Sequence, residues 1–67
     1  MKVYLKLRTN EILKFNKSLK VNELLRELHL LPQEVLVIDT KNRKLLTPDK
    51  ILSEDMEIEI RGVISGG

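Results

Sequence analysis

The sequence ends in two consecutive glycines, Gly66 and Gly67, and these residues are the strongest candidates for chemistry. A terminal glycine presents its α-carboxylate beside no side chain, and the glycine before it has no Cβ to block close backbone approach. Six residues follow Arg61, and fully extended they reach roughly 20 Å. This spacing predicts a tail that enters a narrow active site of a partner and presents a bare carboxylate. The alternative is a frayed terminus or a cloning remnant, because chain ends are commonly disordered.

The rest of the chain offers little for catalysis. His29 is the only histidine and there is no cysteine. We expect His29 to be a structural or surface residue near a helix end, where a cation suits the helix dipole. Ser18, Ser53 and Ser65 have no candidate base close by in the sequence. We therefore predict no catalytic residues in this chain.

Acidic residues cluster before and within the last predicted strand. Glu54 and Asp55 fall in a turn, and Glu57 and Glu59 alternate along the segment that follows. Such carboxylates could together hold Mg²⁺ or Ca²⁺. A solvated strand edge is the simpler interpretation, so we expect no bound metal and no stably bound cofactor.

Length and composition limit the elements that can position these residues. The chain has 67 residues, with 12 Lys+Arg, 10 Asp+Glu and no Cys, and this length fits one small domain. Without disulfide or metal staples, the fold must rest on a core drawn from 24 Leu, Ile and Val residues. The longest apolar run is four residues, which predicts no membrane span. We expect a monomeric, cytoplasmic protein.

Hydrophobic spacing predicts a hairpin followed by a helix. Residues 3–8 and 12–16 alternate around a polar turn at Thr9 and Asn10, which is typical of two paired strands. Helical spacing follows over residues 21–30, and Pro32 is expected to end the helix. The residues predicted to face the core are Val3, Leu5, Leu7, Leu13 and Phe15 from the hairpin, and Val21, Leu24, Leu25 and Leu28 from the helix.

The second half of the chain alternates between apolar segments and polar turns. Residues 35–38 are continuously apolar and predict a strand. We take Asp39 to mark its polar register, which places Val35 and Val37 outward and Leu36 and Ile38 in the core. The remaining segments are a basic turn at 39–44, a short strand at 45–46, a single apolar turn at 51–52 and an alternating strand at 56–61.

This element order predicts an α+β fold. One helix must cover one face of a mixed sheet of four to five strands. Because a strand–helix–strand crossover is normally right-handed and parallel, the last strand is expected beside the first. This is the β-grasp arrangement, with a domain over residues 1–61 and a flexible tail over 62–67.

Three segments carry a resemblance to a known family. They are VNELLREL at 21–28, LSEDMEI at 52–58 and VISGG at 63–67. They resemble the helix, the Leu-x-Asp-Gly-Asp-x-Ile/Val segment and the terminal Val-Ile-Ala-Gly-Gly of the ubiquitin-like sulfur carriers. That family includes the carriers of thiamine and molybdopterin biosynthesis and the small archaeal modifiers. Two departures are Glu54, where the family has a glycine, and a longer 39–44 connection than in the thiamine branch.

The resemblance implies a protein that is a substrate rather than an enzyme. An E1-like adenylating enzyme would use ATP to join Gly67 to AMP, and a sulfur donor enzyme would convert the adenylate into a thiocarboxylate. The sulfur would pass to an acceptor enzyme for thiamine, molybdopterin or tRNA thiolation, or a target lysine would form an isopeptide bond. The tail entering the partner would comprise Gly62, Val63, Ile64, Ser65, Gly66 and Gly67.

The solvent-exposed face of the predicted sheet is a second candidate site. A basic, partly apolar face beside the tail is suited to docking an activating enzyme, and an ordinary surface with scattered apolar residues is an equal alternative. The residues predicted on this face are Tyr4, Lys6, Arg8, Ile12, Lys14, Val35 and Val37.

The basic hairpin also permits a different function, as an RNA-binding or protein-interaction module without tail chemistry. The net charge of +2 is modest, and on this face Tyr4 alone is expected to stack on a base. This alternative also leaves Gly66 and Gly67 without a role. We therefore favour the carrier and do not expect nucleic acid as a partner.

Overall fold

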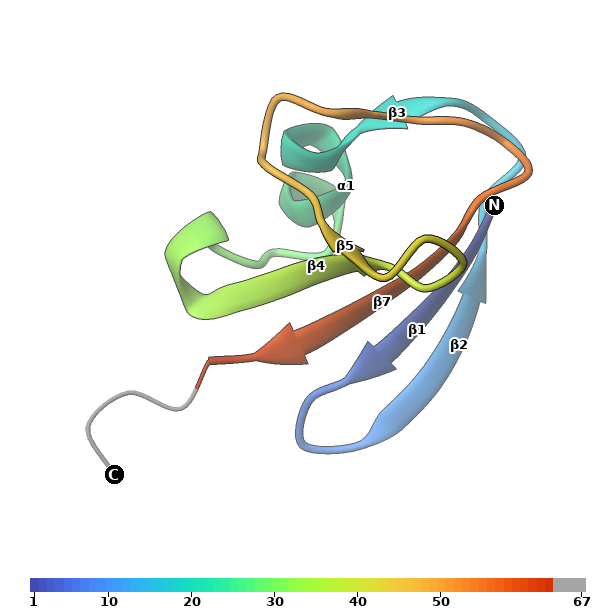
Figure 1. The fold of residues 1–67 in the computed structure, drawn as a ribbon. Helices are drawn as coiled ribbons and strands as arrows, with labels where there is room; N and C mark the ends of the chain where they lie inside the picture. Colours follow the sequence, from blue (N-terminus) through green and yellow to red (C-terminus); the bar gives the residue numbers. More distant parts are fainter. Residues whose placement is uncertain (64–67) are drawn as a thin grey trace.

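Residues 1–63 are described by a computed structural model (Figure 1). They form a small α+β domain with one α-helix, one 3₁₀ helix and seven strands in this described range. The elements are β1 (Lys2–Lys6), β2 (Asn10–Lys14), β3 (Leu19–Lys20), α1 (Val21–Glu27), η1 (Pro32–Glu34), β4 (Val35–Asp39), β5 (Lys44–Leu45), β6 (Ile51–Leu52) and β7 (Glu57–Gly62).

Five strands form one mixed sheet in the order β2-β1-β7-β4-β5. β1 pairs antiparallel with β2 and parallel with β7, and β4 pairs antiparallel with both β7 and β5. The prediction that the last strand lies parallel beside the first is therefore confirmed. β3 and β6 form a separate two-stranded sheet. Residues 51–52 were predicted as a single apolar turn, and no strand was predicted between the hairpin and the helix.

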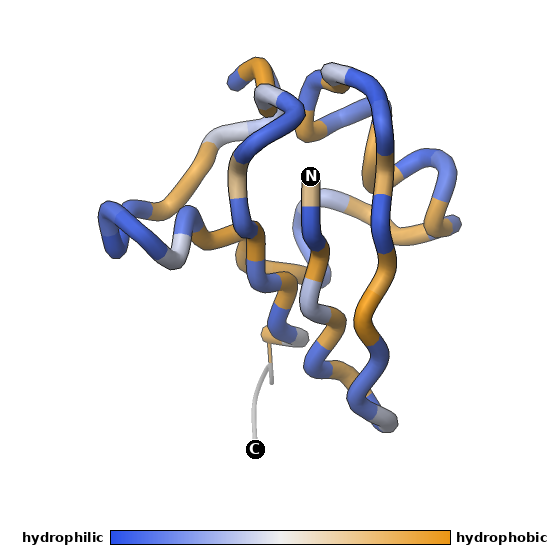
Figure 2. Tube along the Cα trace, turned by 90° about the vertical axis from the view of Figure 1, so that its right-hand side faces the viewer, coloured by the Kyte–Doolittle hydropathy of each residue, from blue (hydrophilic) through white to orange (hydrophobic). Residues whose placement is uncertain are grey.

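The predicted hairpin is confirmed, and its turn lies slightly earlier than expected. Asn10 pairs with Lys6, so the connection consists of residues 7–9. Leu7 was predicted in the core but is 39% exposed, because β1 ends at Lys6 and the strand alternation ends with it. Hydrophobic and hydrophilic residues alternate along the strand traces in Figure 2.

The helix ends three residues before the predicted boundary, and Pro32 does not end it. His29 adopts a left-handed φ of 59°, and its N–H donates to Arg26 O while Leu30 N–H donates to Leu25 O. These two bonds form a Schellman motif, which satisfies carbonyls that a helix end leaves open. Pro32 begins η1 instead.

The core lies between α1 and the inner face of the five-stranded sheet (Figure 1). Leu24 of the helix and Ile58 and Ile60 of β7 are completely buried. Leu52 of β6 is also completely buried, whereas its neighbour Ile51 is 67% exposed. The other buried hydrophobic residues are Val3, Leu5, Leu19, Val21, Leu25, Val35 and Val37.

The predicted register of β4 is wrong. Val35 and Val37 are 7% and 4% exposed and face the core, whereas Leu36 is 41% exposed. Asp39 shares the buried face because its carboxylate accepts hydrogen bonds from Lys41 N and from the Asn42 side chain, the latter at 2.8 Å. Its polarity is satisfied by its own turn, so Asp39 does not mark the solvent side of the strand.

No helix within residues 1–63 is long and apolar enough to cross a membrane.

Candidate functional site

The final strand, β7, lies between two other strands of the sheet, and the C-terminal segment begins at its end. β7 lies between β1 and β4 and extends to Gly62. Val63 N–H then donates to Glu34 O at 2.9 Å, which ties the chain to η1 just beyond the strand. Of the predicted tail, Gly62 and Val63 are described, while Ile64, Ser65, Gly66 and Gly67 lie outside the described residues.

A hollow of about 830 Å³ opens where β7 ends. The turn between β1 and β2 forms part of its lining. Arg8 was predicted on the outer sheet face, but it lies in this turn because β1 ends at Lys6. A Cβ added at Gly62 would lie 3.6 Å from Leu7 Cδ2, which is ordinary contact. Packing therefore does not require glycine at position 62. The residues around the hollow are Lys6, Leu7, Arg8, Thr9, Leu30, Glu34, Val35, Gly62 and Val63.

The outer face of the sheet brings together side chains from neighbouring strands. In one row across the sheet, Ile12, Tyr4, Glu59, Ile38 and Leu45 occupy paired positions on β2, β1, β7, β4 and β5. The outward placement of Tyr4 and Ile12 agrees with the sequence prediction.

The flanking rows complete this outer face. Lys14, Lys2 and Glu57 occupy one row, and Asn10, Lys6, Arg61 and Leu36 occupy the other. Lys6 and Lys14 therefore lie on the outer face as predicted. Val35 and Val37 face the core and cannot belong to it.

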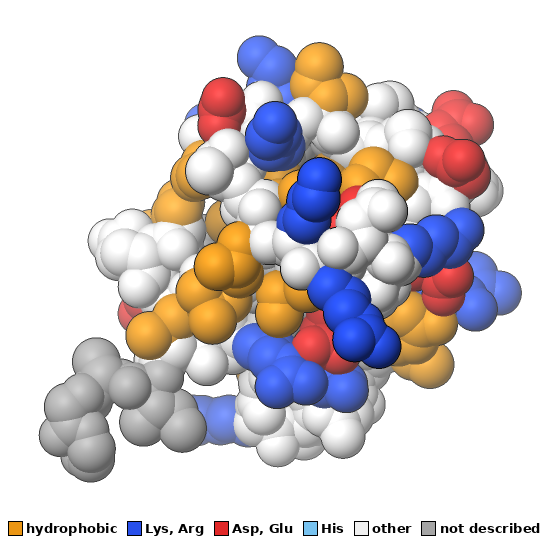
Figure 3. All heavy atoms as spheres, in the orientation of Figure 1, with side chains coloured by type: hydrophobic (Ala, Val, Ile, Leu, Met, Phe, Trp, Pro, Cys, Tyr) orange, Lys and Arg blue, Asp and Glu red, His pale blue; other side chains and the backbone are white. Residues whose placement is uncertain are grey.

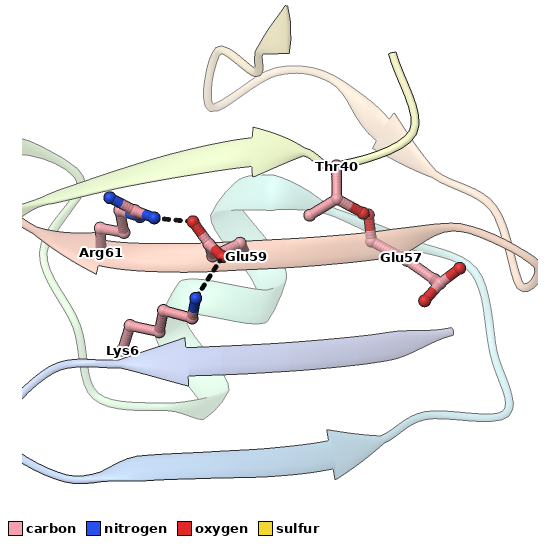
Figure 4. Close-up of polar contacts among 5 residues, drawn as sticks. All are labelled: Lys6, Thr40, Glu57, Glu59 and Arg61. Atoms are coloured by element: carbon pink, nitrogen blue, oxygen red, sulfur yellow. Dashed lines mark hydrogen bonds and ion pairs between the residues drawn. The ribbon is translucent and has the colours of Figure 1, made fainter. Parts of the chain in front are cut away.

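An ion cluster at Glu59 occupies the middle of the outer face (Figure 4). Lys6 Nζ lies 3.0 Å from Glu59 Oε1, and Arg61 Nε pairs with the other carboxylate oxygen. The Glu59 side chain is only 14% exposed. Hydrogen bonds from Lys6 and then Arg61 hold the pKa of Glu59 below its ordinary value of 4.5, so it is ionised at neutral pH.

Glu57 makes different contacts on the same strand. Its carboxylate accepts a 3.1 Å hydrogen bond from the Tyr4 hydroxyl. Its carbonyl accepts a hydrogen bond from Thr40 Oγ1 at 3.0 Å, and Figure 4 shows Thr40 beside Glu57. Lys2 Nζ lies 5.9 Å from the centroid of the Tyr4 ring, within range of a cation–π contact. In the described part of the chain, His, Asp and Glu side chains form no group of three that could hold a metal.

Exposed aliphatic side chains surround the ion cluster. Ile12 and Leu45 are 61% and 64% exposed, and Leu36 is 41% exposed. On the face shown in Figure 3, hydrophobic side chains lie next to Lys and Arg side chains. A face of this composition can bury apolar area against a partner and also attract carboxylates.

The serine candidates have structural contacts in the described residues. Ser18 Oγ donates to Leu52 O at 2.8 Å, and Ser53 Oγ donates to Asp55 Oδ1 at 2.7 Å. The Ser18 hydroxyl joins the segment before β3 to β6, and the Ser53 hydroxyl lies within a local turn. His29 contributes its backbone conformation to the helix end. Ser65 lies outside the described residues.

No protein-family model matches the chain, and no curated protein matches it. The candidate site therefore stands on its geometry. Sequence reasoning missed the pairing of Glu59 with Arg61 and Lys6. The signal was present in the spacing of Glu59 and Arg61, since residues two apart share a strand face, but Lys6 joins them only through the β1–β7 register.

Proposed function

We propose that this domain is a β-grasp domain and that the protein is a sulfur carrier or protein modifier activated at Gly67. Support for the fold comes from the element order and from β1 lying parallel beside β7 at the centre of a mixed sheet. One helix packs on one face of that sheet and leaves the other open. The proposal takes Gly67 as the terminus of the working protein.

In the proposed reaction, the chain is the substrate of an activating enzyme. The Gly67 carboxylate attacks the α-phosphate of ATP and forms an acyl-adenylate, with pyrophosphate as the leaving group. A sulfide equivalent held by a donor enzyme then attacks the acyl carbon, AMP leaves, and sulfur replaces one carboxylate oxygen. Attack by a lysine of another protein would instead give an isopeptide bond.

The observation that carries the proposal is the path of the chain at the end of β7. The strand is held on both sides by β1 and β4, and Arg61 is paired to Glu59 immediately before Gly62. Val63 is 43% exposed and lies at the margin of the hollow. Four residues remain after Val63, ending in Gly66 and Gly67. A rigid body thus holds the start of the segment that the activating enzyme would accept.

The outer face is the proposed docking surface for the activating enzyme. We assign Tyr4, Lys6, Ile12 and Lys14 of the predicted set to this surface, with Leu36 in place of Val35 and Val37 as the exposed residue of β4. Arg8 is left out because it lies in the turn between β1 and β2. This face adjoins the end of β7 because Arg61 belongs to both. Docking here would leave the tail free to enter the enzyme.

The proposal is tested by incubating the full chain with ATP, Mg²⁺ and a host activating enzyme, then measuring intact mass. We expect an AMP adduct, and deletion of Gly67 should abolish it. Lys50→Ala is the control, because Lys50 is exposed and lies outside both the tail and the outer face. The proposal would be contradicted if the folded protein stayed unmodified while the same enzyme adenylated another carrier.

A nucleic-acid function is a second candidate because Lys2, Lys6, Lys14 and Arg61 share the outer face. Glu57 and Glu59 lie among these cations, and Glu59 pairs with Lys6 and Arg61. This arrangement weakens the attraction for phosphates. Binding of single-stranded RNA with a steep salt dependence would favour this second function.

A further inference from the structure

The two edges of the five-stranded sheet differ in how much backbone they leave open. β5 is a two-residue strand, whereas β2 is a five-residue strand at the opposite edge. Leu13 of β2 is half-buried, and its other four residues are exposed. Among the described residues, β2 pairs with β1 alone. A long exposed edge strand can accept another strand.

The hydrogen-bond pattern shows which backbone groups of β2 point outward. The amino group of Met1 donates to Phe15 O at 2.7 Å, and Phe15 N–H donates to Met1 O at 2.9 Å. In an antiparallel ladder, bonded and non-bonded pairs alternate, so Leu13 and Glu11 also turn their backbone groups toward β1. The N–H and C=O groups of Asn10, Ile12 and Lys14 therefore point toward the open edge.

The side chains beside this edge carry a specific charge pattern. Lys14 lies directly opposite Lys2, a like-charge cross-strand pair, which is destabilising and would be relieved by a carboxylate on a third strand. Ile12 is 61% exposed in the next row. On the helix side, Leu13 packs at the margin of the core and Glu11 is exposed.

A second copy of the chain fits this edge poorly. Antiparallel pairing over the whole length of β2 would set Ile12 opposite its symmetry mate and Asn10 opposite Lys14 of the other copy. Lys2, Lys14 and the other copy's Lys6 would then lie in one row across the joined sheet. Accumulated positive charge opposes that pairing, as lysines do at edge strands generally.

We propose that β2 is a docking edge for an extended segment of another protein. The segment adds antiparallel to β2 and carries a carboxylate opposite Lys14 and an aliphatic residue opposite Ile12. Backbone hydrogen bonds supply affinity, and alternate side chains supply specificity. The site is independent of Gly67 and of the tail chemistry.

The probe is a capped peptide with the central sequence Asp-Ile-Val-Lys-Thr, which places Asp opposite Lys14 and Lys opposite Glu11. Its control is the isomer Lys-Ile-Val-Asp-Thr, which has the same composition with the charges exchanged. We expect the first peptide to bind the full chain about tenfold more tightly by calorimetry, because two attractive cross-strand pairs become repulsive in the isomer. Hydrogen exchange should slow at the amides of Asn10, Ile12 and Lys14.

Lys14→Glu should abolish the preference between the two peptides, because each peptide then makes one attractive and one repulsive cross-strand pair. Lys50→Glu, with the same charge change away from β2, should leave the preference unchanged. Deleting residues 64–67 should leave binding unchanged, which separates this proposal from the proposed function. Equal affinity for both isomers, or unchanged exchange at Ile12, would overturn the proposal. A dimer in sedimentation that protects the same amides would assign the edge to a second copy and also overturn it.

Discussion

Both faces of the five-stranded sheet carry aliphatic side chains, but α1 covers only one of them. On the inner face, Val3, Ile58 and Ile60 are completely buried. On the outer face, Ile12 and Leu45 remain more than half exposed. The same residue types therefore have different effects, because burial determines how much apolar area leaves water. The inner face stabilises the domain, and the outer face is available for contacts with other molecules.

β4 contains this difference within consecutive residues. Val37 is 4% exposed and Leu36 is 41% exposed. Each residue also pairs with a β7 residue of similar exposure. Val37 pairs with the buried Ile60, and Leu36 pairs with the exposed Arg61. Substituting one inner-face residue and one outer-face residue therefore compares how much each face contributes to the free energy of unfolding.

The largest expected effect is from truncating the inner face. Ile60→Ala leaves a cavity in a fully buried site and should lower the free energy of unfolding by about 2–5 kcal/mol. Leu45→Ala removes a side chain that is 64% exposed and should change it by about 0.5 kcal/mol or less. Urea denaturation measures both. Equal losses would show that the two faces do not differ as described.

The register of β4 gives the next largest effect. Val37→Thr keeps the shape of the side chain but buries a hydroxyl, which should cost about 1–3 kcal/mol. Leu36→Thr places the hydroxyl on the solvent side and should cost less than about 1 kcal/mol. Thermal unfolding of the two variants measures the difference. A greater loss for Leu36→Thr would support the opposite register.

Asp39 gives the inner face a pH dependence. The Asn42 side-chain hydrogen bond holds the pKa of Asp39 below its ordinary value of 3.8. The stability from this ionised group is present above the ordinary pKa and is lost as the pH falls through the lowered folded value.

When the pH falls from about 6 to about 3, the free energy of unfolding should therefore decrease less for Asp39→Asn than for the parent. Urea denaturation at each pH measures this free energy. Glu11→Gln, which removes a carboxylate from the exposed β2 edge, is the control for lost charge. If the parent and the Asp39→Asn variant had the same pH dependence of unfolding free energy, ionised Asp39 would not stabilise the fold.

The smallest expected change concerns the outer ion cluster. Glu59→Gln weakens the contacts to Lys6 and Arg61, whose side chains are 46% and 55% exposed and can return to water. We expect a stability loss of about 1 kcal/mol or less. The loss should shrink in high salt, because ions screen exposed charges. A loss as large as that of Ile60→Ala would place the cluster among the main stabilising contacts.

The fold followed from the sequence wherever one periodicity controlled a segment. Alternation located β1, β2 and β7, and helical spacing located α1. Asp39 misled the register of β4 because a polar residue can be buried when its own turn supplies hydrogen bonds. β3 and β6 are two-residue strands, which are too short to show a period, and the left-handed His29 ended the helix without a glycine.

The candidate site was only partly readable from the sequence. Gly66 and Gly67 are visible in any reading of the chain, and alternation placed Tyr4 and Ile12 correctly. The cluster of Lys6, Glu59 and Arg61 depends on which strands are neighbours. The open backbone of β2 likewise requires the ladder pattern. Both properties arise from pairing between segments distant in sequence, which local spacing does not determine.

The most direct test of the central claim is the intact mass of the protein isolated from its own cells under conditions that preserve thioesters and thioacids. The account predicts a chain ending at Gly67 in which a fraction has sulfur in place of one carboxylate oxygen, or is joined through Gly67 to a lysine. A chain that continues beyond Gly67, or one that carries only the free acid while the activating and donor enzymes are present, would contradict it.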